Sequence, residues 1–334
     1  MQPTIKDIAD KANVSIATVS RVLNHKGGYS QETYRRVQHV IEETGFSLNS
    51  LARAFRTGQT RTVGLLVPDI CNEFFARIAR QISLWFLQRN YVTLICASDE
   101  SQKIEAEYFR ELQNRSVDGL LYIQGRKRAV ETTAKQNVPI VYIDRYSDES
   151  GPCVVSDNPA GGKIAAEALL ERGRNRPLLI RDACETSAVK GRCAGFLETM
   201  RKNDIAVPVY SVVSPISLAG FQCMEEVLRK QEDFDSVFCT NDPLAMGVSQ
   251  ALLSAGIRIP QDVTVIGFDD NAIIREAFPF VLTIRQDTTQ LVNNACSALL
   301  NMMEERSIDW TSKIVPVQLV DYGKEGDNER NYSN

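Results

Sequence analysis

The sequence of 334 residues contains only two histidines, His25 and His39, and both lie close to its N-terminus. The rest of the chain therefore lacks the imidazole groups from which a histidine metal site or a catalytic triad is built. It also lacks any run approaching the roughly eighteen apolar residues of a membrane span. The first residues, MQPTIKDIAD, lack the apolar core of a signal peptide. We therefore expect a cytoplasmic protein without a membrane partner.

Sequence signatures of common enzyme classes are missing as well. No G-x-G-x-x-G follows the first apolar run, no phosphate-loop lysine is present, and the pair Gly161-Gly162 is by itself a weak signal. Eight cysteines are scattered without a Cys-x-x-Cys pair, and most lie in apolar runs, so we expect reduced thiols in the core. The sequence thus favours a binding protein over an enzyme and predicts no cofactor and no metal.

Positive charge is concentrated in the first part of the chain. The net charge is −4 overall, but residues 1–61 carry nine lysines or arginines against five aspartates or glutamates, a net of +4 that leaves −8 for the remainder. An acidic chain is a poor partner for nucleic acid, whereas a basic segment attracts a polyanion. Only the first segment is therefore a candidate for DNA binding.

Three short helices are predicted before residue 46. Thr4 is a suitable N-cap for the first, and apolar residues follow it at helical spacing. Ser15 caps a second helix with an apolar inner face, and Ser30 caps a third that Gly45 can end. The outer face of the second helix carries Ile16, Ala17, Ser20, Arg21 and Asn24. This arrangement fits a DNA-binding helix-turn-helix, although periodicity alone is equally compatible with a generic helical hairpin.

From Thr62 onward, apolar strand-like runs alternate with amphipathic helical stretches. The runs are TVGLLV, YVTLIC, DGLLYI, PIVYID, RPLLIR, VPVYSVV, DSVFCT and VTVIGF. Such alternation is typical of parallel sheets covered by helices on both faces, and this many units predict two lobes. We therefore expect a helix-turn-helix domain over residues 1–46, a hinge helix and linker over 47–61, a two-lobed core over 62–322 and a polar tail over 323–334.

Polar and aromatic side chains follow the ends of these runs. Ligands of doubly wound sheets bind beyond the carboxyl ends of the strands, so these side chains are candidates for a binding site. The set comprises Asn72, Phe74, Phe75, Asp144, Arg145, Arg192, Asn241, Asp242, Asp269 and Gln286. Planar polar groups suit paired sugar hydroxyls, and aromatic rings cover the C–H face of a sugar. An adenine-type ligand would use the rings but few of the charges, and each residue taken singly could equally be structural.

The segment TIKDIADKANVSIATVSRVLN resembles the lactose/galactose repressor (LacI/GalR) family, and the resemblance continues through YSQETYRRVQHVIEETGFSLNSLARAFRTGQTRTVGLLVPDI. It extends over essentially the whole chain. The resemblance implies a homodimeric, sequence-specific regulator of transcription, a repressor by default, that binds operator DNA and is controlled by a small sugar-like effector. It also implies a small all-α helix-turn-helix domain followed by an α/β periplasmic-binding-protein-like core of two doubly wound parallel-sheet lobes.

The resemblance assigns DNA contacts to the second helix. Ile16 and Ala17 stand at the positions that discriminate half-sites, where they can offer only apolar contact, for instance with a thymine methyl. Ser20, Arg21 and Asn24 supply hydrogen bonds to bases or phosphates, with a solvated surface arginine as the alternative for Arg21. Two helix N-termini are available to phosphates, at Thr4 and Ser15.

In the family, the stretch matching NSLARAFR is a hinge helix that forms only on the operator and wedges an apolar residue into the minor groove. The wedge residue is usually leucine, whereas this chain has Phe55 there, between Arg53 and Arg56. Phenylalanine also unstacks base steps, so the resemblance still predicts a wedge, while the preferred central step is left open. The alternative is that Phe55 packs against the core.

Six short motifs of the core resemble the pocket of periplasmic ribose-binding proteins. They are Asn72-x-Phe74-Phe75, Asp144-Arg145, Arg192-x-x-Gly195-Phe196, Asn241-Asp242, Gly267-Phe268-Asp269 and Thr283-Ile284-x-Gln286. This resemblance implies that Asn72, Phe74, Phe75, Asp144, Arg145, Arg192, Asn241, Asp269 and Gln286 contact the effector. It favours a pentose, a ketohexose or a related acid. Three questions stay open: whether the effector is a sugar phosphate, whether it releases or tightens DNA binding, and whether the protein activates transcription instead of repressing it. The tail lacks the apolar heptads that make tetramers in the family.

Overall fold

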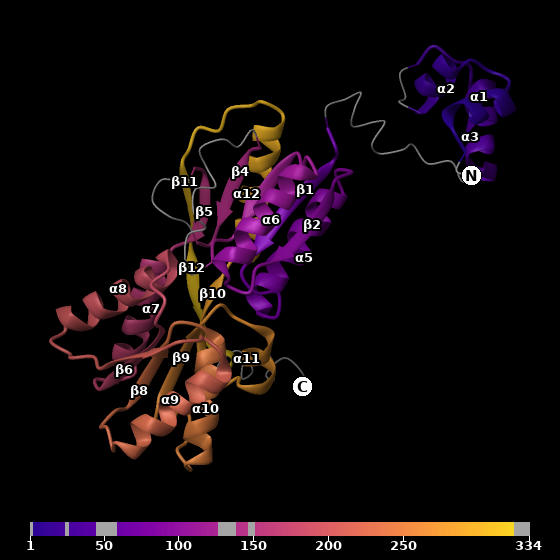
Figure 1. Ribbon diagram of the computed structural model, residues 1–334. Helices are drawn as coiled ribbons and strands as arrows, with labels where there is room; N and C mark the ends of the chain where they lie inside the picture. The colour runs from indigo at the N-terminus through magenta and orange to yellow at the C-terminus, as the bar shows by residue number, and fades with distance from the viewer. Residues whose placement is uncertain (1–2, 24–26, 45–58, 126–137, 146–150, 324–334) are drawn as a thin grey trace, which may run out of the picture. The chain divides into compact units, whose positions relative to one another are not determined.

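The computed structural model describes residues 3–23, 27–44, 59–125, 138–145 and 151–323, and the chain divides into two compact units after Arg61 (Figure 1). None of the helices in these ranges is long and apolar enough to cross a membrane.

The described part of the first unit contains three helices, α1 (Ile5–Ala12), α2 (Ile16–Leu23) and α3 (Gln31–Thr44). Thr4 and Asp7 form a capping box at the start of α1, since the Asp7 amide donates to the Thr4 hydroxyl and the Thr4 amide donates to the Asp7 carboxylate. Val19 and Val22 of α2 are fully buried against residues of α1 and α3. The predicted helices and the inner face of α2 are therefore present.

In the second unit, the described residues form two six-stranded sheets. The first has the order β11-β5-β4-β3-β1-β2 and is parallel throughout. Its strands are β1 (Thr62–Val67), β2 (Val92–Ala97), β3 (Gly119–Tyr122), β4 (Ile140–Ile143), β5 (Cys153–Ser156) and β11 (Ser312–Val315). The second has the order β12-β10-β9-β8-β6-β7. Its strands are β6 (Pro177–Asp182), β7 (Val209–Val212), β8 (Ser236–Cys239), β9 (Thr264–Phe268), β10 (Leu282–Gln286) and β12 (Val317–Val320).

Helices cover both faces of each sheet. One face of the first sheet packs against α5 (Glu73–Leu87) and α12 (Thr288–Met303), and the other packs against α6 (Gln102–Asn114). The second sheet lies between the pair α7 (Asn158–Glu171) and α8 (Ser187–Lys202) and a group of three helices. That group comprises α9 (Ser217–Arg229), α10 (Asp242–Ser254) and α11 (Ala272–Ala277). The expected two-lobed, doubly wound core is thereby confirmed.

Three strands and one pairing direction were not expected from the sequence. The eight apolar runs coincide with β1–β4 and β6–β9, and β10 ends at Gln286, which was expected at a strand end. β5, β11 and β12 have no counterpart in the sequence analysis. β11 and β12 are edge strands of four residues each, and most of their residues are not buried, so they carry no continuous apolar run. β12 pairs antiparallel with β10, which corrects the expectation of purely parallel sheets.

The chain passes between the lobes at three single residues. Asp157 joins β5 to α7, Asp287 joins β10 to α12, and Pro316 joins β11 to β12. Two of these residues also begin a helix, because their carboxylates accept from the backbone amides of Ala160 and Gln290. Short crossings of this kind let two rigid lobes change their relative angle with few backbone rotations.

All eight cysteines are free thiols. Five are buried, Cys184 and Cys223 are partly buried, and Cys71 is exposed, so the expectation of core thiols holds for five of the eight.

Candidate functional site

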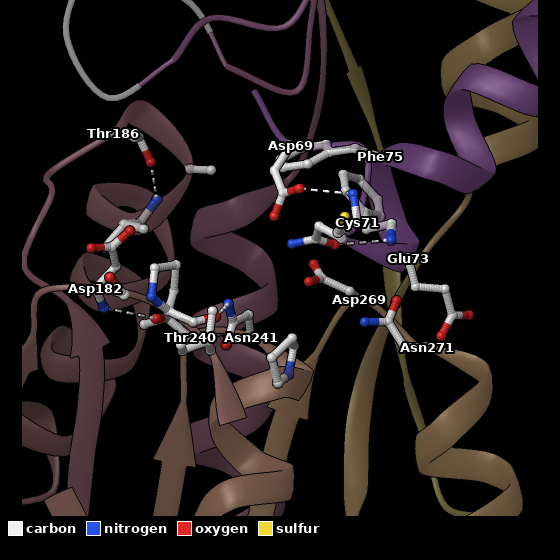
Figure 2. Close-up of a pocket in the computed structure, with 18 of the residues that line it drawn as sticks. Asp69, Cys71, Glu73, Phe75, Asp182, Thr186, Thr240, Asn241, Asp269 and Asn271 are labelled. Carbon is white, nitrogen blue, oxygen red and sulfur yellow. Dashed lines mark hydrogen bonds between the residues drawn. The ribbon is translucent and has the colours of Figure 1, made fainter. Parts of the chain in front are cut away.

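A cavity of about 640 Å³ lies between the two lobes, at the carboxyl ends of their strands (Figure 2). Eight of the nine effector contacts expected from the sequence line it: Asn72, Phe74, Phe75, Asp144, Arg145, Arg192, Asn241 and Asp269. These residues come from both sheets, because parallel strands all present their carboxyl ends at one edge. Figure 2 shows Asp182 and Thr186 on one side of the cavity and Asp69, Cys71 and Glu73 on the other.

The start of α5 forms one wall. The Asn72 side chain caps this helix by accepting a hydrogen bond of 3.0 Å from the Phe74 amide. Phe74 and Phe75 are both almost fully buried and meet edge to face, with ring centroids 5.5 Å apart. They belong to the hydrophobic core and also line the cavity, so the structural and ligand-facing interpretations of this pair are compatible.

Asp144 and Arg145 follow β4 on the same lobe. Arg145 makes ion pairs with Glu100 at 3.1 Å and with Asp144 at 3.6 Å, and its guanidinium lies 5.0 Å from the centre of the Phe75 ring. Although burial opposes its charge, the carboxylates of Glu100 and Asp144 raise the pKa of Arg145, which therefore stays protonated. The backbone of Asp144 has a φ of 64°, a conformation that costs energy for a non-glycine residue and is frequent at functional sites.

Arg192 is the centre of the opposite wall. It lies on α8, which approaches α7 so closely that a Cβ added at Gly195 would stand 1.9 Å from the carbonyl oxygen of Pro159. Nε of Arg192 donates to Asn158 at 2.8 Å, and Nη1 donates to the carbonyl oxygen of Thr240 at 2.7 Å. The glycines of α7 and α8, Gly162 among them, thus serve helix packing rather than phosphate binding and bring Arg192 into the cavity.

Asp269 faces Arg192 across the floor of the cavity. Its carboxylate lies 3.4 Å from Nη1 of Arg192 and accepts a hydrogen bond of 2.6 Å from Gln286. Burial raises the pKa of Asp269 to about 6, with repulsion from Asp144 adding to the shift and attraction from Arg192 opposing it. A carboxyl group with this pKa is poised to respond to a ligand that changes the local charge.

Gln286 is the one expected contact that does not line the cavity. It lies behind Asp269 and borders a second cavity of about 380 Å³ together with Arg77 and Arg285. Its position at the end of β10 supports Asp269 instead of reaching the ligand space. The sequence pattern could not distinguish these two placements, since both put Gln286 at a strand end.

Asp242, the other acid of the Asn241-Asp242 motif, is also structural. Its carboxylate accepts from the Asn271 amide and from the Thr283 hydroxyl, both at 2.7 Å. Burial, together with repulsion from Asp269, raises the pKa of Asp242 well above its usual range. Asn241 caps α10 by accepting from the Leu244 amide and donates to the carbonyl oxygen of Pro215.

Several lining residues were missed by the sequence analysis. Those with carboxylates or hydroxyls are Asp69, Glu73, Asp99, Glu100, Asp182, Thr186, Ser214, Ser217 and Thr240. Asp69, Glu100 and Asp182 lie at or just beyond the ends of β1, β2 and β6, so the strand-end rule could have found them. Across the described residues, no cluster of histidine, cysteine, aspartate and glutamate side chains is arranged to hold a metal ion.

Helix α5 also ties the two lobes together beside the cavity. Glu73 accepts a hydrogen bond of 2.7 Å from the Ala272 amide. Arg77 donates to the carbonyl oxygens of Asp269 and Asp270, each at 2.8 Å. The loop that carries the Asp269 carboxylate into the cavity is therefore held by the other lobe, so a ligand at Asp269 is linked to the position of the lobes.

The DNA-facing candidates of the first unit lie around α2. Ile16 is 48% exposed, and Ala17 and Arg21 are exposed beside it, while Ser20 is partly buried. Ser15 accepts from the Thr18 amide at 3.1 Å, and the first turn of α2 contains no acid, which leaves its N-terminus suited to a phosphate. The remaining candidates, Asn24, Arg53, Phe55 and Arg56, lie outside the described residues.

Thr4 is placed differently from Ser15. Its amide and its hydroxyl both donate to the Asp7 carboxylate at 2.7 Å. These hydrogen bonds, the hydroxyl bond first, lower the pKa of Asp7, so a negative charge already occupies the start of α1. The phosphate contact expected at Thr4 stays a prediction, and it would have to compete with this carboxylate.

Two family models match the chain and account for both units. Residues 4–49 match the bacterial regulatory proteins of the lacI family, and residues 60–312 match the periplasmic binding proteins and sugar binding domain of the LacI family. The protein belongs to the LacI family. In this LacI-family chain the first match contains α1 to α3, and the second contains every residue that lines the cavity.

Alignments with similar proteins cover most of this LacI-family chain. It is 32% identical to the ribose operon repressor of Halalkalibacterium halodurans over 98% of this chain and 99% of the relative. A lac repressor dimer bound to operator and an anti-inducer has the same fold, with a TM-score of 0.88 at 22% identity over 96% of this chain and 98% of that one. A LacI-family regulator from Enterococcus faecium with bound ribose aligns at 29% identity over 78% of this chain and 96% of its own, with a TM-score of 0.69.

Proposed function

We propose that this protein represses genes of carbohydrate utilisation by binding an operator, and that a small sugar-like effector in the cavity between the lobes controls its affinity for DNA. Its place of action is then the cytoplasm. The observation that carries the proposal is the combination, in one chain, of an exposed α2 face with a two-lobed cavity rich in planar polar groups. The names of the relatives support it, since they include repressors of ribose and sucrose operons.

The proposal assigns separate roles to the two units. In the first, α2 enters the major groove, where Ile16 and Ala17 select the half-site and Arg21 donates to bases or phosphates. In the second, Asp144 and Asp269 accept hydrogen bonds from the effector, Arg192 and Asn241 donate, and the two phenylalanines cover the apolar face of a sugar ring. Asn24 and the segment with Arg53, Phe55 and Arg56 complete the proposed DNA contacts.

Arg21→Ala tests the recognition helix. We expect it to reduce discrimination between an operator selected from random duplexes and a scrambled duplex by about 1–3 kcal/mol, because a lost base contact matters only at the correct base. Fluorescence anisotropy measures both affinities. Arg36→Ala, at an exposed position on α3, is the matched control and should leave the discrimination unchanged.

If Arg21→Ala weakens both duplexes equally, the side chain is no more than a phosphate contact, and base recognition must be assigned elsewhere. The wild-type complex should also weaken with salt, with a slope of log affinity against log salt of about −0.9 per phosphate neutralised. A complex insensitive to salt would contradict the proposed role of the basic first segment.

Exposed apolar side chains on the second unit support the proposed homodimer. Leu84 and Leu87 on α5 lie beside Val92 and Ile95 of β2, the edge strand of the first sheet. The second sheet repeats this arrangement at its own edge, with exposed Val209 and Val213 on or next to β7 and Leu218 on α9. Apolar patches of this kind on a soluble domain usually mark an interface.

The double variant Leu87→Glu, Leu218→Glu is expected to be monomeric and to lose high affinity for a two-fold operator, since each chain has one helix-turn-helix and carboxylates in the interface would be desolvated. Sedimentation velocity measures the assembly. Ile314→Glu, on the opposite edge strand β11, should remain dimeric. A monomeric wild-type protein that binds a half-site tightly would contradict the proposed dimer.

A further inference from the structure

The cavity between the lobes contains far more negative than positive groups. The described residues that line it include seven carboxylates and two guanidiniums. The carboxylates belong to Asp69, Glu73, Asp99, Glu100, Asp144, Asp182 and Asp269, and the guanidiniums to Arg145 and Arg192. Arg77 lies close by at the rear, so even with it included the carboxylates are in excess.

The three arginines already donate to the protein. Arg145 is paired with Glu100 and Asp144, while Arg192 donates to Asn158 and to the Thr240 carbonyl and lies next to Asp269. Arg77 donates to two carbonyl oxygens. A phosphate or carboxylate on the ligand would have to displace these acceptors inside a field of carboxylates, which makes an anionic ligand unfavourable.

One carboxylate oxygen of a residue that lines the cavity has no hydrogen-bond partner among the described residues. Asp144 is 2% exposed, and its Oδ1 is buried without a hydrogen bond, while its Oδ2 lies 3.6 Å from Nε of Arg145. An ionised carboxylate only accepts hydrogen bonds, and leaving a buried acceptor unsatisfied costs about 1–3 kcal/mol, more when it is charged. The ligand is therefore expected to bring a donor to this oxygen.

A second buried carboxylate, that of Asp182, lines the cavity from the other lobe and accepts a hydrogen bond of 2.9 Å from the Cys184 amide. Asp182 is 3% exposed, lies at the end of β6, and acts electrostatically on Arg145 together with Glu100 and Asp144. Asp269 also interacts with Asp144, and the raised pKa of Asp269 reflects its burial together with this repulsion. Negative charge is thus in excess on both walls of the cavity (Figure 2).

From this geometry we infer that the effector is a polyhydroxylated amine, such as an amino sugar, whose ammonium group binds at Asp144 with Asp182 and Asp269 around it. The inference rests on the proposed function and narrows its ligand, because it excludes sugar acids and sugar phosphates. An ammonium group offers three donors and a positive charge, whereas a hydroxyl offers one donor and no charge. Only the ammonium group both donates a hydrogen bond to Oδ1 of Asp144 and reduces the excess negative charge of the cavity.

Isothermal titration calorimetry with matched probes tests this inference. The amines are D-glucosamine and D-galactosamine, the uncharged probes are D-glucose, D-galactose and D-ribose, and the anions are D-glucose 6-phosphate and D-gluconate. At neutral pH we expect at least one amine to bind at least tenfold more tightly than its parent sugar, which corresponds to about 1.4 kcal/mol, and more tightly than any anion.

Variants locate the ammonium site. Asp144→Asn and Asp182→Asn should each lower the preference for the amine over its parent sugar by tenfold or more, because each removes one charge while keeping nearly the same shape. Glu171→Gln, at an exposed position at the end of α7, should leave the preference unchanged. Thermal melting and operator binding show whether each variant is folded, and the two aspartate variants provide independent readings if one fails to fold.

Tighter binding of an uncharged sugar than of every amine would overturn the inference and leave the proposed function intact. Tighter binding of an anion would do the same. If none of the probes binds, the inference and the sugar-binding part of the proposed function both fail, while the operator titrations still test the DNA-binding part.

Discussion

Replacing Arg192 with alanine is expected to abolish the response of operator binding to the effector, with operator affinity in the absence of effector retained. Arg192 is 5% exposed and is held by Asn158, the Thr240 carbonyl, the Asp269 carboxylate and the face of the Phe268 ring, 3.7 Å away. Its loss removes a donor from the cavity and leaves the buried Asp269 without its counter-charge. Breaking a buried ion pair by removing one partner can cost about 3–5 kcal/mol, and the cost is expected to be smaller here because the Asp269 carboxylate can take up a proton once Arg192 is lost.

Two further variants separate ligand binding from folding. Arg192→Lys keeps the positive charge but cannot reproduce the fork of the guanidinium, so it should retain more stability than the alanine variant and still respond poorly to effector. Arg201→Ala lies on the same helix at an exposed position and should behave as wild type. Circular dichroism checks the fold, and fluorescence anisotropy with labelled operator measures the response.

The same titrations determine the direction of the ligand's effect. If the effector releases the protein from DNA, Arg192→Ala stays on the operator at every effector concentration. If the effector is a corepressor, the variant fails to bind the operator at any concentration. The coupling between the two ligands should amount to about 1–3 kcal/mol and be reciprocal, so operator must change effector affinity by the same factor. An unchanged midpoint of the effector response in a folded Arg192→Ala protein would remove Arg192 from the proposed site.

The second large effect concerns Asp269→Asn and the dependence of stability on pH. The pKa of Asp269 is about 6 in the folded protein, mainly because the group is buried, against an ordinary value of 3.8. Between about pH 4 and 6 the folded chain therefore holds a proton that the unfolded chain has lost, and the free energy of unfolding decreases as the pH rises through this window. Without ligand, ionisation of Asp269 is expected to lower the free energy of unfolding by about 3 kcal/mol, since one pKa unit corresponds to 1.36 kcal/mol.

The side-chain amide introduced by Asp269→Asn cannot ionise, so the variant is expected to be more stable than the wild type at pH 7 without effector, while losing the effector response. Arg192, Arg77, Asp144 and Gln286 face this group, and its charge repels that of Asp242, so the comparison uses the difference between variant and wild type at each pH. Urea unfolding from pH 4 to 8 measures it. Asp204→Asn, at an exposed site, is the control. Parallel stability profiles for wild type and Asp269→Asn would contradict the shifted pKa.

Much of the site could be predicted because its position follows from a general property of parallel sheets. Asp144 and Asp269 lie at the ends of strand-like runs, Asn72 follows the first run after a short loop, and all three line the cavity. Asp182 also ends a strand, β6, and lines the cavity, although the sequence analysis named only Arg192 after that strand. The strand-end rule failed to separate Gln286, which supports Asp269 from behind, from residues that face the ligand.

The sequence alone determined the helices of the first unit, most strands of the second and the family, because caps, apolar periodicity and local motifs depend on neighbouring residues. The tertiary structure decided which polar groups face one another. Arg192 meets Asp269 because Gly195 lets α8 approach α7, and Oδ1 of Asp144 is buried where none of the described residues donates to it. Burial and unbalanced charge depend on segments far apart in the chain, so the raised pKa of Asp269 and the excess of carboxylates in the cavity appear only when the lobes are folded together.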